Sequence, residues 1–230
     1  MIISSQNKIA LVTGADGGLG THVTRALLDN GATVIGVSRN AQPSSSDITV
    51  LSADLSSPEE TKTLIDGIVA RFGRLDILAH LVGGFAGGKT IADTDGPTFQ
   101  RMLDLNLNSA FYVMRAVIPH MRRQGSGRII AIASRAAEDP GPGVGAYSAS
   151  KAALVSLVRT VALENKDLAI TANVILPGTM DTPANRKAMP GADRSKWVQP
   201  ASVASLIAWL ASEAGKDVTG AVIPIYGSGL

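Results

Sequence analysis

Residues 8–20 read Lys-Ile-Ala-Leu-Val-Thr-Gly-Ala-Asp-Gly-Gly-Leu-Gly, and this stretch decides the fold class. Residues 8–13 form a continuous apolar run of the kind found in strands buried on both faces of a sheet. The glycines that follow have the spacing Gly-x-x-x-Gly-x-Gly, and a helical pattern begins among them. Glycines at such a junction let the backbone approach a pyrophosphate, while the helix N-terminus supplies free N–H groups and a favourable dipole. A turn that only tightens strand-helix packing is the alternative. We favour nucleotide binding, with contacts at Gly14, Asp16, Gly18, Leu19 and Gly20.

Apolar runs and amphipathic stretches alternate along the whole chain. We expect strands at 8–13, 33–38, 48–53, 76–82, 128–133, 169–176 and 222–226, and helices at 19–30, 57–72, 98–124, 147–165 and 200–212. This alternation implies one α/β domain over residues 1–230. We expect a doubly wound, Rossmann-type parallel sheet of about seven strands with helices on both faces. Residues 178–199 have weak periodicity. Because such a long loop is usually functional, we expect a substrate lid at approximately 179–199.

Composition excludes several classes of function. The chain has 230 residues, 45% of them hydrophobic, and a formal net charge of +2 with dispersed basic residues, so we expect no nucleic-acid partner. It has no cysteine, which excludes disulfides and thiolate catalysis, and its three histidines lie far apart, so we expect no metal site. No apolar run is long enough to span a membrane, and residues 1–8 are too short and polar for a signal peptide. A cytoplasmic location is the default expectation.

The residues after the second strand bear on the choice of dinucleotide. An acidic residue there would bind the adenosine ribose hydroxyls and repel a 2′-phosphate, but this chain has Ser38 and Arg39. Arg39 can pair with a 2′-phosphate through charge-assisted hydrogen bonds, and an ordinary surface arginine is the alternative interpretation. We therefore expect NADP, with NAD also possible, and contacts from Ser38 and Arg39.

A catalytic group is indicated by Tyr147, Lys151 and Ser134. Tyr147 and Lys151 are four residues apart on one expected helix and so share a face. A nearby ammonium stabilises phenolate, so we expect that Lys151, helped by a cationic nicotinamide, brings the pKa of Tyr147 below its usual value near 10. A Tyr-x-x-x-Lys pair also occurs by chance on helices. Ser134 strengthens the interpretation because it follows the fifth strand, where open α/β sheets place their chemistry.

Together these residues make the chain resemble the short-chain dehydrogenases/reductases over essentially its whole length. The motifs are Thr-Gly-x-x-x-Gly-x-Gly at 13–20, the adenine-holding Asp54 followed by Leu55, Asn106, the Ser134/Tyr147/Lys151 group, and Pro177-Gly178 with Thr182. The resemblance implies that Tyr147 is the general acid/base, that Lys151 lowers its pKa and binds the nicotinamide ribose, that Ser134 orients the substrate oxygen, and that Asn106 supports a relay water. It also implies cofactor contacts at Asp54, Leu55, Val82, Gly83, Tyr147, Lys151, Pro177, Gly178, Thr179 and Thr182.

The chain departs from the family pattern at two places. The Asn-Asn-Ala-Gly expected after the fourth strand is His80-Leu81-Val82-Gly83, and we expect His80 to be structural. Gly17 stands where NADP-preferring members often carry a basic residue, which weakens the inference from Arg39. Segments 83–88 and 181–190 resemble quinonoid dihydropteridine reductase, a branch of this family, and would flank the substrate side of the cleft. That branch does not rely on a serine at the position of Ser134 and uses an acidic residue after the second strand, so this chain departs from it at both positions.

The resemblance and the residues together favour an oxidoreductase that transfers a hydride between NADPH and a small carbonyl or alcohol. A quinonoid dihydropteridine-type reductase is one alternative. A non-catalytic dinucleotide-binding sensor is another, which the presence of Tyr147 and Lys151 disfavours. An extended-branch epimerase or dehydratase is disfavoured by chain length and glycine spacing. Small and apolar residues on the helices at 98–124 and 147–165 predict a homo-oligomer, and the resemblance implies that it is a tetramer, with a dimer as the alternative.

Overall fold

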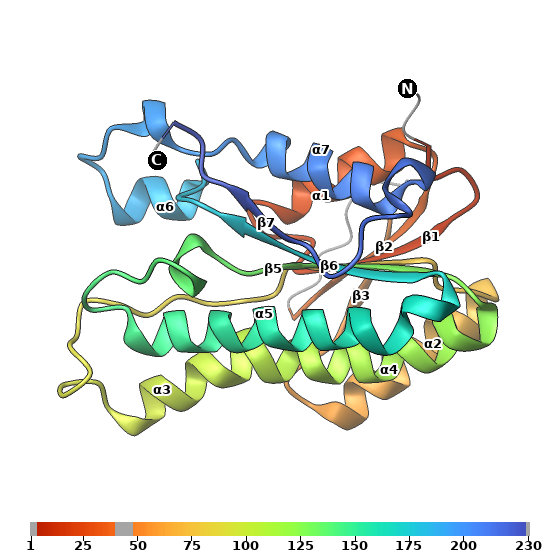
Figure 1. Ribbon diagram of the computed structural model, residues 1–230, viewed down its shortest axis with the longest axis horizontal. Coiled ribbons are helices and arrows are strands. Elements are labelled where there is room, and N and C mark those ends of the chain that lie inside the picture. Colours follow the sequence, from red (N-terminus) through yellow and green to blue (C-terminus); the bar gives the residue numbers. More distant parts are fainter. Residues whose placement is uncertain (1–3, 40–47, 229–230) are drawn as a thin grey trace.

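The computed structural model describes residues 4–39 and 48–228 (Figure 1). Seven parallel strands form one sheet in the order β3-β2-β1-β4-β5-β6-β7. Their bounds are β1 Ile9–Thr13, β2 Thr33–Ser38, β3 Thr49–Ser52, β4 Ile77–His80, β5 Gly127–Ile132, β6 Ile170–Pro177 and β7 Val222–Ile225. The predicted seven-stranded, doubly wound sheet is confirmed.

Helices cover both faces of the sheet. Their bounds are α1 Gly20–Asp29, α2 Pro58–Phe72, α3 Gly96–Leu103, α4 Ser109–Gln124, α5 Gly145–Asn165, α6 Pro183–Ala188 and α7 Pro200–Ala211. Short 3₁₀ turns occur at Arg135–Ala137, Lys166–Leu168, Arg194–Lys196 and Glu213–Gly215. Helices α1 and α7 lie on one face, and α2, α4 and α5 lie on the other (Figure 1). This is the three-layer arrangement that strands buried on both sides require.

Alternating side chains of each strand fill two separate hydrophobic cores. Leu11 of β1 packs in the core beneath α2, α4 and α5, with Val113 of α4. Its neighbour Val12 packs in the opposite core with Ile207 of α7. The four side chains are completely buried. The apolar runs in the sequence therefore correspond to strands that face two cores.

The order of the strands reverses between β1 and β4. From β1 the chain moves outward to β2 and β3, then returns to β4 on the other side of β1 and proceeds to β7. In an open α/β sheet the carboxyl ends of strands beside such a reversal leave a crevice where ligands bind. The candidate site is therefore expected next to the ends of β1 and β4.

Two segments differ from the expectation. The helix expected at 98–124 is divided into α3 and α4 by a π-helical turn at Asp104–Asn108. The segment 178–199 is not an irregular loop: it contains α6, and a parallel bridge pairs Met180 with Val198. Thr182 caps α6 by accepting a hydrogen bond from the N–H of Asn185 at 3.3 Å, a contact that weak hydrophobic periodicity does not reveal.

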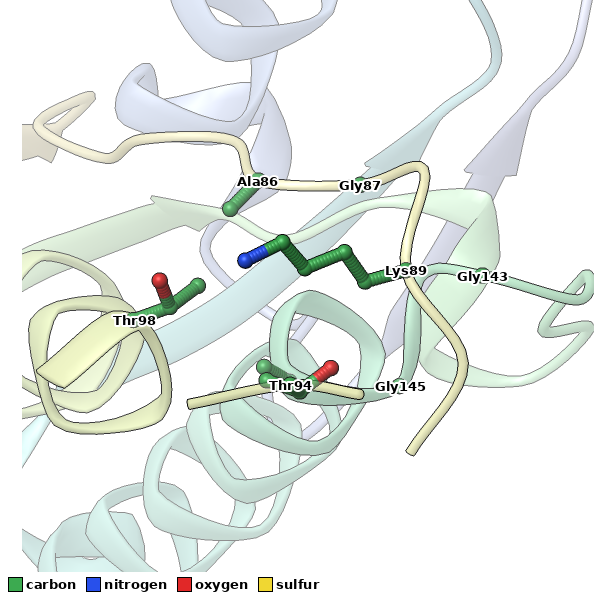
Figure 2. A pocket seen from close by; sticks show the side chains of 8 residues that line it. Ala86, Gly87, Lys89, Thr94, Thr98, Gly143 and Gly145 are labelled. Atoms are coloured by element: carbon green, nitrogen blue, oxygen red, sulfur yellow. The ribbon is translucent and has the colours of Figure 1, made fainter. Parts of the chain in front are cut away.

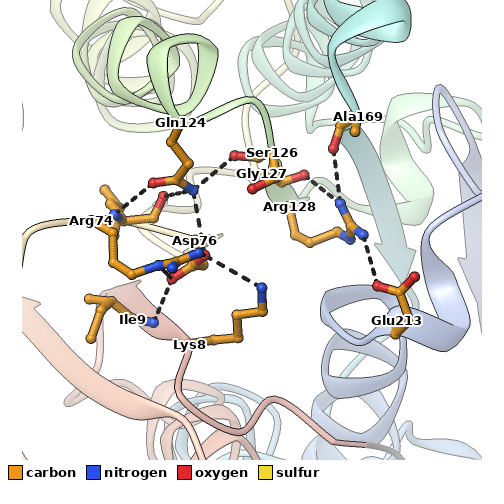
Figure 3. Close-up of polar contacts among 11 residues, drawn as sticks. Lys8, Ile9, Arg74, Asp76, Gln124, Ser126, Gly127, Arg128, Ala169 and Glu213 are labelled. Atoms are coloured by element: carbon orange, nitrogen blue, oxygen red, sulfur yellow. Dashed lines mark hydrogen bonds and ion pairs between the residues drawn. The ribbon is translucent and has the colours of Figure 1, made fainter.

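A buried carboxylate ties the amino-terminal edge of the sheet together (Figure 3). Asp76, immediately before β4, is 4% exposed. Its Oδ2 accepts hydrogen bonds from the backbone N–H of Ile9 at 2.9 Å and from Nε of Arg74 at 2.8 Å. The ammonium of Lys8 lies 3.7 Å from Oδ1, and the amide of Gln124, at the end of α4, lies 3.4 Å from it. One side chain thus joins β1, β4 and α4 at the edge away from the crevice.

The substitution Asp76→Ala is expected to lower the free energy of unfolding by about 3 kcal/mol, because it leaves the Ile9 N–H without its acceptor and Arg74 without its buried partner. Urea unfolding measures this loss. Asp29→Ala, which removes an exposed partner of Arg25 on α1, is the matched control and should change the free energy by less than about 0.5 kcal/mol. Equal effects of the two substitutions would contradict the assigned role of Asp76.

Candidate functional site

The glycine loop after β1 leaves no room for side chains at its closest approach. Gly14 has φ +68° and donates its N–H to the carbonyl of Val37 at 2.7 Å. A Cβ on Gly20 would lie 2.1 Å from the carbonyl oxygen of Gly14. No side chain caps the N-terminus of α1, which begins here. The loop and the first turn of α1 therefore present backbone N–H groups, as phosphate binding requires.

The side chains of this loop have different surroundings. Asp16 is exposed, whereas Leu19 is 7% exposed and packs in the core of the α1/α7 face. A Cβ on Gly18 would lie 2.9 Å from Cβ and Cγ2 of Thr182. The segment that leads into α6 therefore contacts the glycine loop directly.

The ends of β2 and β3 bring Ser38, Arg39 and Asp54 into one region. Ser38 is 7% exposed, and its hydroxyl has no hydrogen-bond partner within the part of the chain that the structure describes. Arg39 is exposed, and its charge contributes to the lowered pKa of Asp54, which is caused first by hydrogen bonds from Ser56. Leu55 is 5% exposed and belongs to the core, so its side chain faces away from this region. An orphaned hydroxyl beside an exposed guanidinium suits a polar, anionic ligand.

The predicted catalytic group assembles at the carboxyl ends of β4 and β5. Tyr147, in the first turn of α5, lines the same cleft as Ser134, which follows β5 and accepts the N–H of Ala136 at 3.2 Å. Its ring meets that of Phe85 edge to face, with centroids 5.0 Å apart. Burial raises the pKa of Tyr147 above its usual value, and the Ser134 side chain only partly opposes this rise.

Lys151, one turn after Tyr147 on α5, has a buried ammonium. The residue is 5% exposed, and its Nζ donates to the carbonyl of Ile132 at 2.8 Å. Burial lowers the pKa of Lys151 to about 8. In the chain by itself, burial is the largest effect on the pKa of Tyr147. The expectation that Lys151, helped by a cationic nicotinamide, lowers this pKa stays a prediction.

The π-helical turn places Asn106 in the interior between the loop after β4 and α5. Its side-chain oxygen accepts the N–H of Gly84 at 2.9 Å, and its nitrogen donates to the carbonyl of Gly84 at 3.1 Å and to Ser150 Oγ at 3.0 Å. Ser150 in turn donates to the carbonyl of Tyr147 at 2.7 Å. Asn106 is completely buried, so its side-chain amide positions the loop and the catalytic helix.

His80 is structural, as predicted, and supplies polar bracing where the family has asparagine. Its Nδ1 lies 3.1 Å from Thr13 Oγ1 of β1, and its Nε2 lies 3.5 Å from Ser109 Oγ of α4. Ser109 donates to the carbonyl of Leu105 in the π-helical turn at 2.8 Å. Complete burial, with a smaller effect of the Lys151 charge, lowers the pKa of His80 to about 3. A neutral imidazole therefore links β1, β4 and the π-helical turn.

The far side of the site comes from the end of β6. Gly178 donates its N–H to the carbonyl of Ile225 at 3.0 Å, and a Cβ at Gly178 would lie 3.2 Å from the carbonyl oxygen of Tyr226. Pro177 is buried, Thr179 is exposed and Thr182 is 7% exposed. The predicted group at 177–182 thus faces the glycine loop across the sheet's carboxyl edge.

These residues surround one cleft of about 930 Å³. The predicted site residues that line it are Gly14, Gly18, Leu19, Gly20, Gly83, Ser134, Tyr147, Lys151, Pro177, Gly178, Thr179 and Thr182. Seven others lie outside its wall: Asp16, Ser38, Arg39, Asp54, Leu55, Val82 and Asn106. The wall also includes Met189 and Trp197 of the predicted lid, and three residues that our sequence reasoning did not single out, Arg135, Val144 and Tyr226. Arg135 pairs with Asp139 at 2.8 Å and lies over the ring of Tyr226. Of these three, only Arg135 had a signal in the sequence, its position next to Ser134.

A smaller pocket of about 170 Å³ lies beside the loop that follows β4. Lys89 extends across it toward Thr98, with Gly87 and Gly145 in the wall (Figure 2). Its ammonium is 3.0 Å from the carboxylate of Asp95. The charge in this pocket is therefore already balanced by a neighbouring residue.

Two kinds of feature are absent from the described residues. Within residues 4–39 and 48–228, no helix is long and apolar enough to cross a membrane. No cluster of three or more His, Cys, Asp or Glu side chains suited to a metal ion occurs in the same ranges.

Comparison with known proteins identifies the family. Residues 8–193 match the family described as short chain dehydrogenase. The chain belongs to this family. It is therefore an NAD(P)-dependent oxidoreductase that acts on small molecules. The acetoacetyl-CoA reductase of Allochromatium vinosum is 31% identical over 243 residues, covering 96% of this chain and 97% of that protein. The 7alpha-hydroxysteroid dehydrogenase of Escherichia coli strain K12 is 29% identical over 242 residues, covering 97% and 94%.

Solved structures of short-chain dehydrogenases share the fold. The RhlG/NADP active-site complex of Pseudomonas aeruginosa superposes with a TM-score of 0.90 at 30% identity, covering 99% of this chain and 98% of that one. ElxO with NADP bound gives a TM-score of 0.91 at 26% identity, covering 96% and 98%. These comparisons support the family as a whole. The narrower resemblance of segments 83–88 and 181–190 to quinonoid dihydropteridine reductase stays a prediction.

The buried amine of Lys151 predicts a specific dependence of stability on pH. Since its pKa falls from 10.5 to about 8 on folding, the folded protein releases this proton at a lower pH than the unfolded chain. The free energy of unfolding should therefore rise between pH 8 and 10.5, by roughly 3 kcal/mol in total relative to Lys151→Met. Urea unfolding of both proteins across this range measures the difference. If the free energies of unfolding of the wild-type protein and Lys151→Met differ by the same amount at every pH in this range, the lowered pKa of a buried amine at this position is contradicted.

Proposed function

We propose that this short-chain dehydrogenase is an NADPH-dependent reductase of a small carbonyl compound, or the dehydrogenase of the corresponding alcohol. The observation that carries the proposal is that the Tyr147 phenol and the Ser134 hydroxyl, which lowers the pKa of that phenol, line one cleft, with Lys151 one helical turn away. A phenol and a hydroxyl at one point can bind a single reacting oxygen, one donating a proton and the other a hydrogen bond.

The residues around the cleft fit a dinucleotide. The glycine loop leaves a cradle that a Cβ at Gly20 would fill, and the buried Ser38 hydroxyl lacks a partner among the described residues. When bound, NADP(H) supplies or accepts the hydride. The residues proposed to hold it are Gly14, Asp16, Gly18, Leu19, Gly20, Ser38, Arg39, Asp54, Leu55, Val82, Gly83, Tyr147, Lys151, Pro177, Gly178, Thr179 and Thr182. Leu55 and Leu19 would act through their backbone, because their side chains pack in the cores.

The catalytic steps follow from the protonation of the side chains. Burial raises the pKa of Tyr147, so its phenol keeps its proton at neutral pH and can donate it to a carbonyl oxygen as negative charge develops there. Ser134 stabilises that oxygen by a hydrogen bond. Lys151 provides a positive charge near the phenolate that forms. Asn106 positions Gly84 and, through Ser150, the helix that carries Tyr147. Its support of a relay water stays a prediction.

Segment 179–199 is proposed as the substrate lid. Thr182 anchors its start against Gly18, and Met189 and Trp197 face the cleft. A homotetramer or dimer is proposed from the exposed apolar side chains of Phe111 on α4 and Leu163 on α5.

Tyr147→Phe tests the proton transfer. It keeps the ring against Phe85 and removes the proton, so kcat should fall by about 10²–10⁴-fold while the affinity for NADPH stays unchanged. Steady-state kinetics and a fluorescence titration of NADPH measure the two quantities. Retention of most of kcat would contradict the role of Tyr147.

The same assays separate a carbonyl substrate from a pterin. Ser134→Ala should lower kcat/KM for ketones and aldehydes by about 10²-fold, because one donor to the developing oxyanion is lost. If quinonoid dihydropterin is turned over far better than any carbonyl and Ser134→Ala leaves its rate unchanged, the pterin alternative is correct.

Arg39→Ala tests the proposed preference for NADPH. Losing one charge-assisted contact to phosphate costs about 1.5–3 kcal/mol, so KM for NADPH should rise by about 10–150-fold while KM for NADH changes little. Arg25→Ala, an exposed arginine on α1, is the matched control. Equal changes for NADPH and NADH would mean that Arg39 is an ordinary surface residue.

A further inference from the structure

Phe85 is an exposed aromatic side chain beside the proposed acid. It is 63% exposed, although phenylalanine is usually buried. Its ring lines the 930 Å³ cleft and meets the ring of Tyr147 at 71°, with centroids 5.0 Å apart. The apolar surface that remains open to water therefore lies next to the point where the substrate oxygen is expected.

The loop that carries Phe85 is fixed on both sides of it. Asn106 holds both backbone groups of Gly84, and a Cβ on Gly84 would lie 2.7 Å from the side chain of Leu105. On the other side, a Cβ on Gly87 would lie 2.7 Å from Cζ of Phe85 and 3.2 Å from Val144. The missing side chain at Gly87 thus leaves the space that the phenylalanine ring occupies. An exposed ring held in one place by its own loop is suited to contact a ligand.

Other apolar side chains line the same cleft, beside the glycine loop and charged residues such as Arg135 and Lys196. Met189, at the end of α6, is 38% exposed, and Trp197 is partly exposed on the same segment. Together with Val144 and Tyr226 they give part of the cleft wall an apolar and aromatic surface. Sites of this kind bind the flat body of a ligand through dispersion and ring contacts, while a few polar groups fix its orientation.

We propose that Phe85 is a specificity-determining residue that binds the ring of a cyclic carbonyl or alcohol substrate whose oxygen lies at Tyr147 and Ser134. The inference rests on the proposed carbonyl/alcohol activity and adds the class of its substrate, an aromatic or alicyclic compound. A ring in this place covers the exposed part of Phe85 in offset or edge-to-face contact. A short linear ketone reaches Tyr147 as well but leaves Phe85 in water.

The experiment compares acetophenone and cyclohexanone with butanone as substrates of the intact enzyme with NADPH. Phe85→Ala should lower kcat/KM for the two cyclic ketones by roughly 30-fold, from the lost ring contact and buried apolar area, and for butanone by less than about threefold. Phe85→Leu keeps an apolar side chain and should give a smaller loss in the same direction. Phe99→Ala, which removes an equally simple exposed ring from α3 outside the cleft, should change none of these values.

A second measurement does not depend on turnover. Calorimetric titration of 1-phenylethanol into the enzyme with NADP should show the same loss of affinity in Phe85→Ala. Equal losses for cyclic and linear ketones, unchanged values for both, or no binding of 1-phenylethanol to the wild-type enzyme would overturn the inference. Failure of the proposed function looks different, because the wild-type enzyme would then reduce none of the ketones while 1-phenylethanol binding still depended on Phe85.

Discussion

The ammonium of Lys151 lies almost completely out of water, 2.8 Å from the carbonyl of Ile132, and the surrounding loops are shaped by it. A Cβ on Gly83 would lie 3.0 Å from its Nζ and 2.8 Å from Asn106 Oδ1, so the loop after β4 can pass only as backbone. The charge of Lys151 also adds to the lowering of the pKa of His80, so the histidine behind it stays neutral. Burying an amine with a single carbonyl partner lowers its pKa and reduces stability at neutral pH. Ionisable groups whose pKa is shifted by burial in this way are often found at functional sites.

Polar bracing around Lys151 comes from two chains of hydrogen bonds that meet at the π-helical turn. One connects Thr13, His80 and Ser109 and ends on the carbonyl of Leu105. The other connects Gly84, Asn106 and Ser150 and ends on the carbonyl of Tyr147. Extra-wide helical turns often occur at functional sites, and here the turn places Asn106 among groups from three elements. The substitution of His80 for the asparagine of the family pattern therefore preserves the bracing with a different side chain.

The amino edge of the sheet contributes to stability, and the carboxyl edge carries the candidate site. At the amino edge, Asp76 joins β1, β4 and the end of α4 through bonds that are satisfied within the protein. The carboxyl edge differs. There the glycine loop presents backbone without side chains, and the Ser38 hydroxyl has no partner among the described residues. The Phe85 ring at this edge is open to water. The satisfied hydrogen bonds at the amino edge and the buried strands stabilise the fold. The polar groups at the carboxyl edge can therefore stay without protein partners.

The sequence by itself determined the fold class, because continuous apolar runs alternating with amphipathic stretches permit a parallel sheet buried on both faces and little else. It also determined the grouping of Ser134, Tyr147 and Lys151, since strand ends and a four-residue helical spacing are local properties. Only the tertiary structure decided the burial of the catalytic side chains and the contacts between distant segments, because local spacing does not encode them. The desolvation of Tyr147 and Lys151 depends on what packs around them, and in the chain by itself it raises the pKa of the tyrosine and lowers that of the lysine. The helix α6 at 183–188, the π-helical turn and the contact of Phe85 with Tyr147 likewise depend on caps, clashes and contacts between segments far apart in the chain.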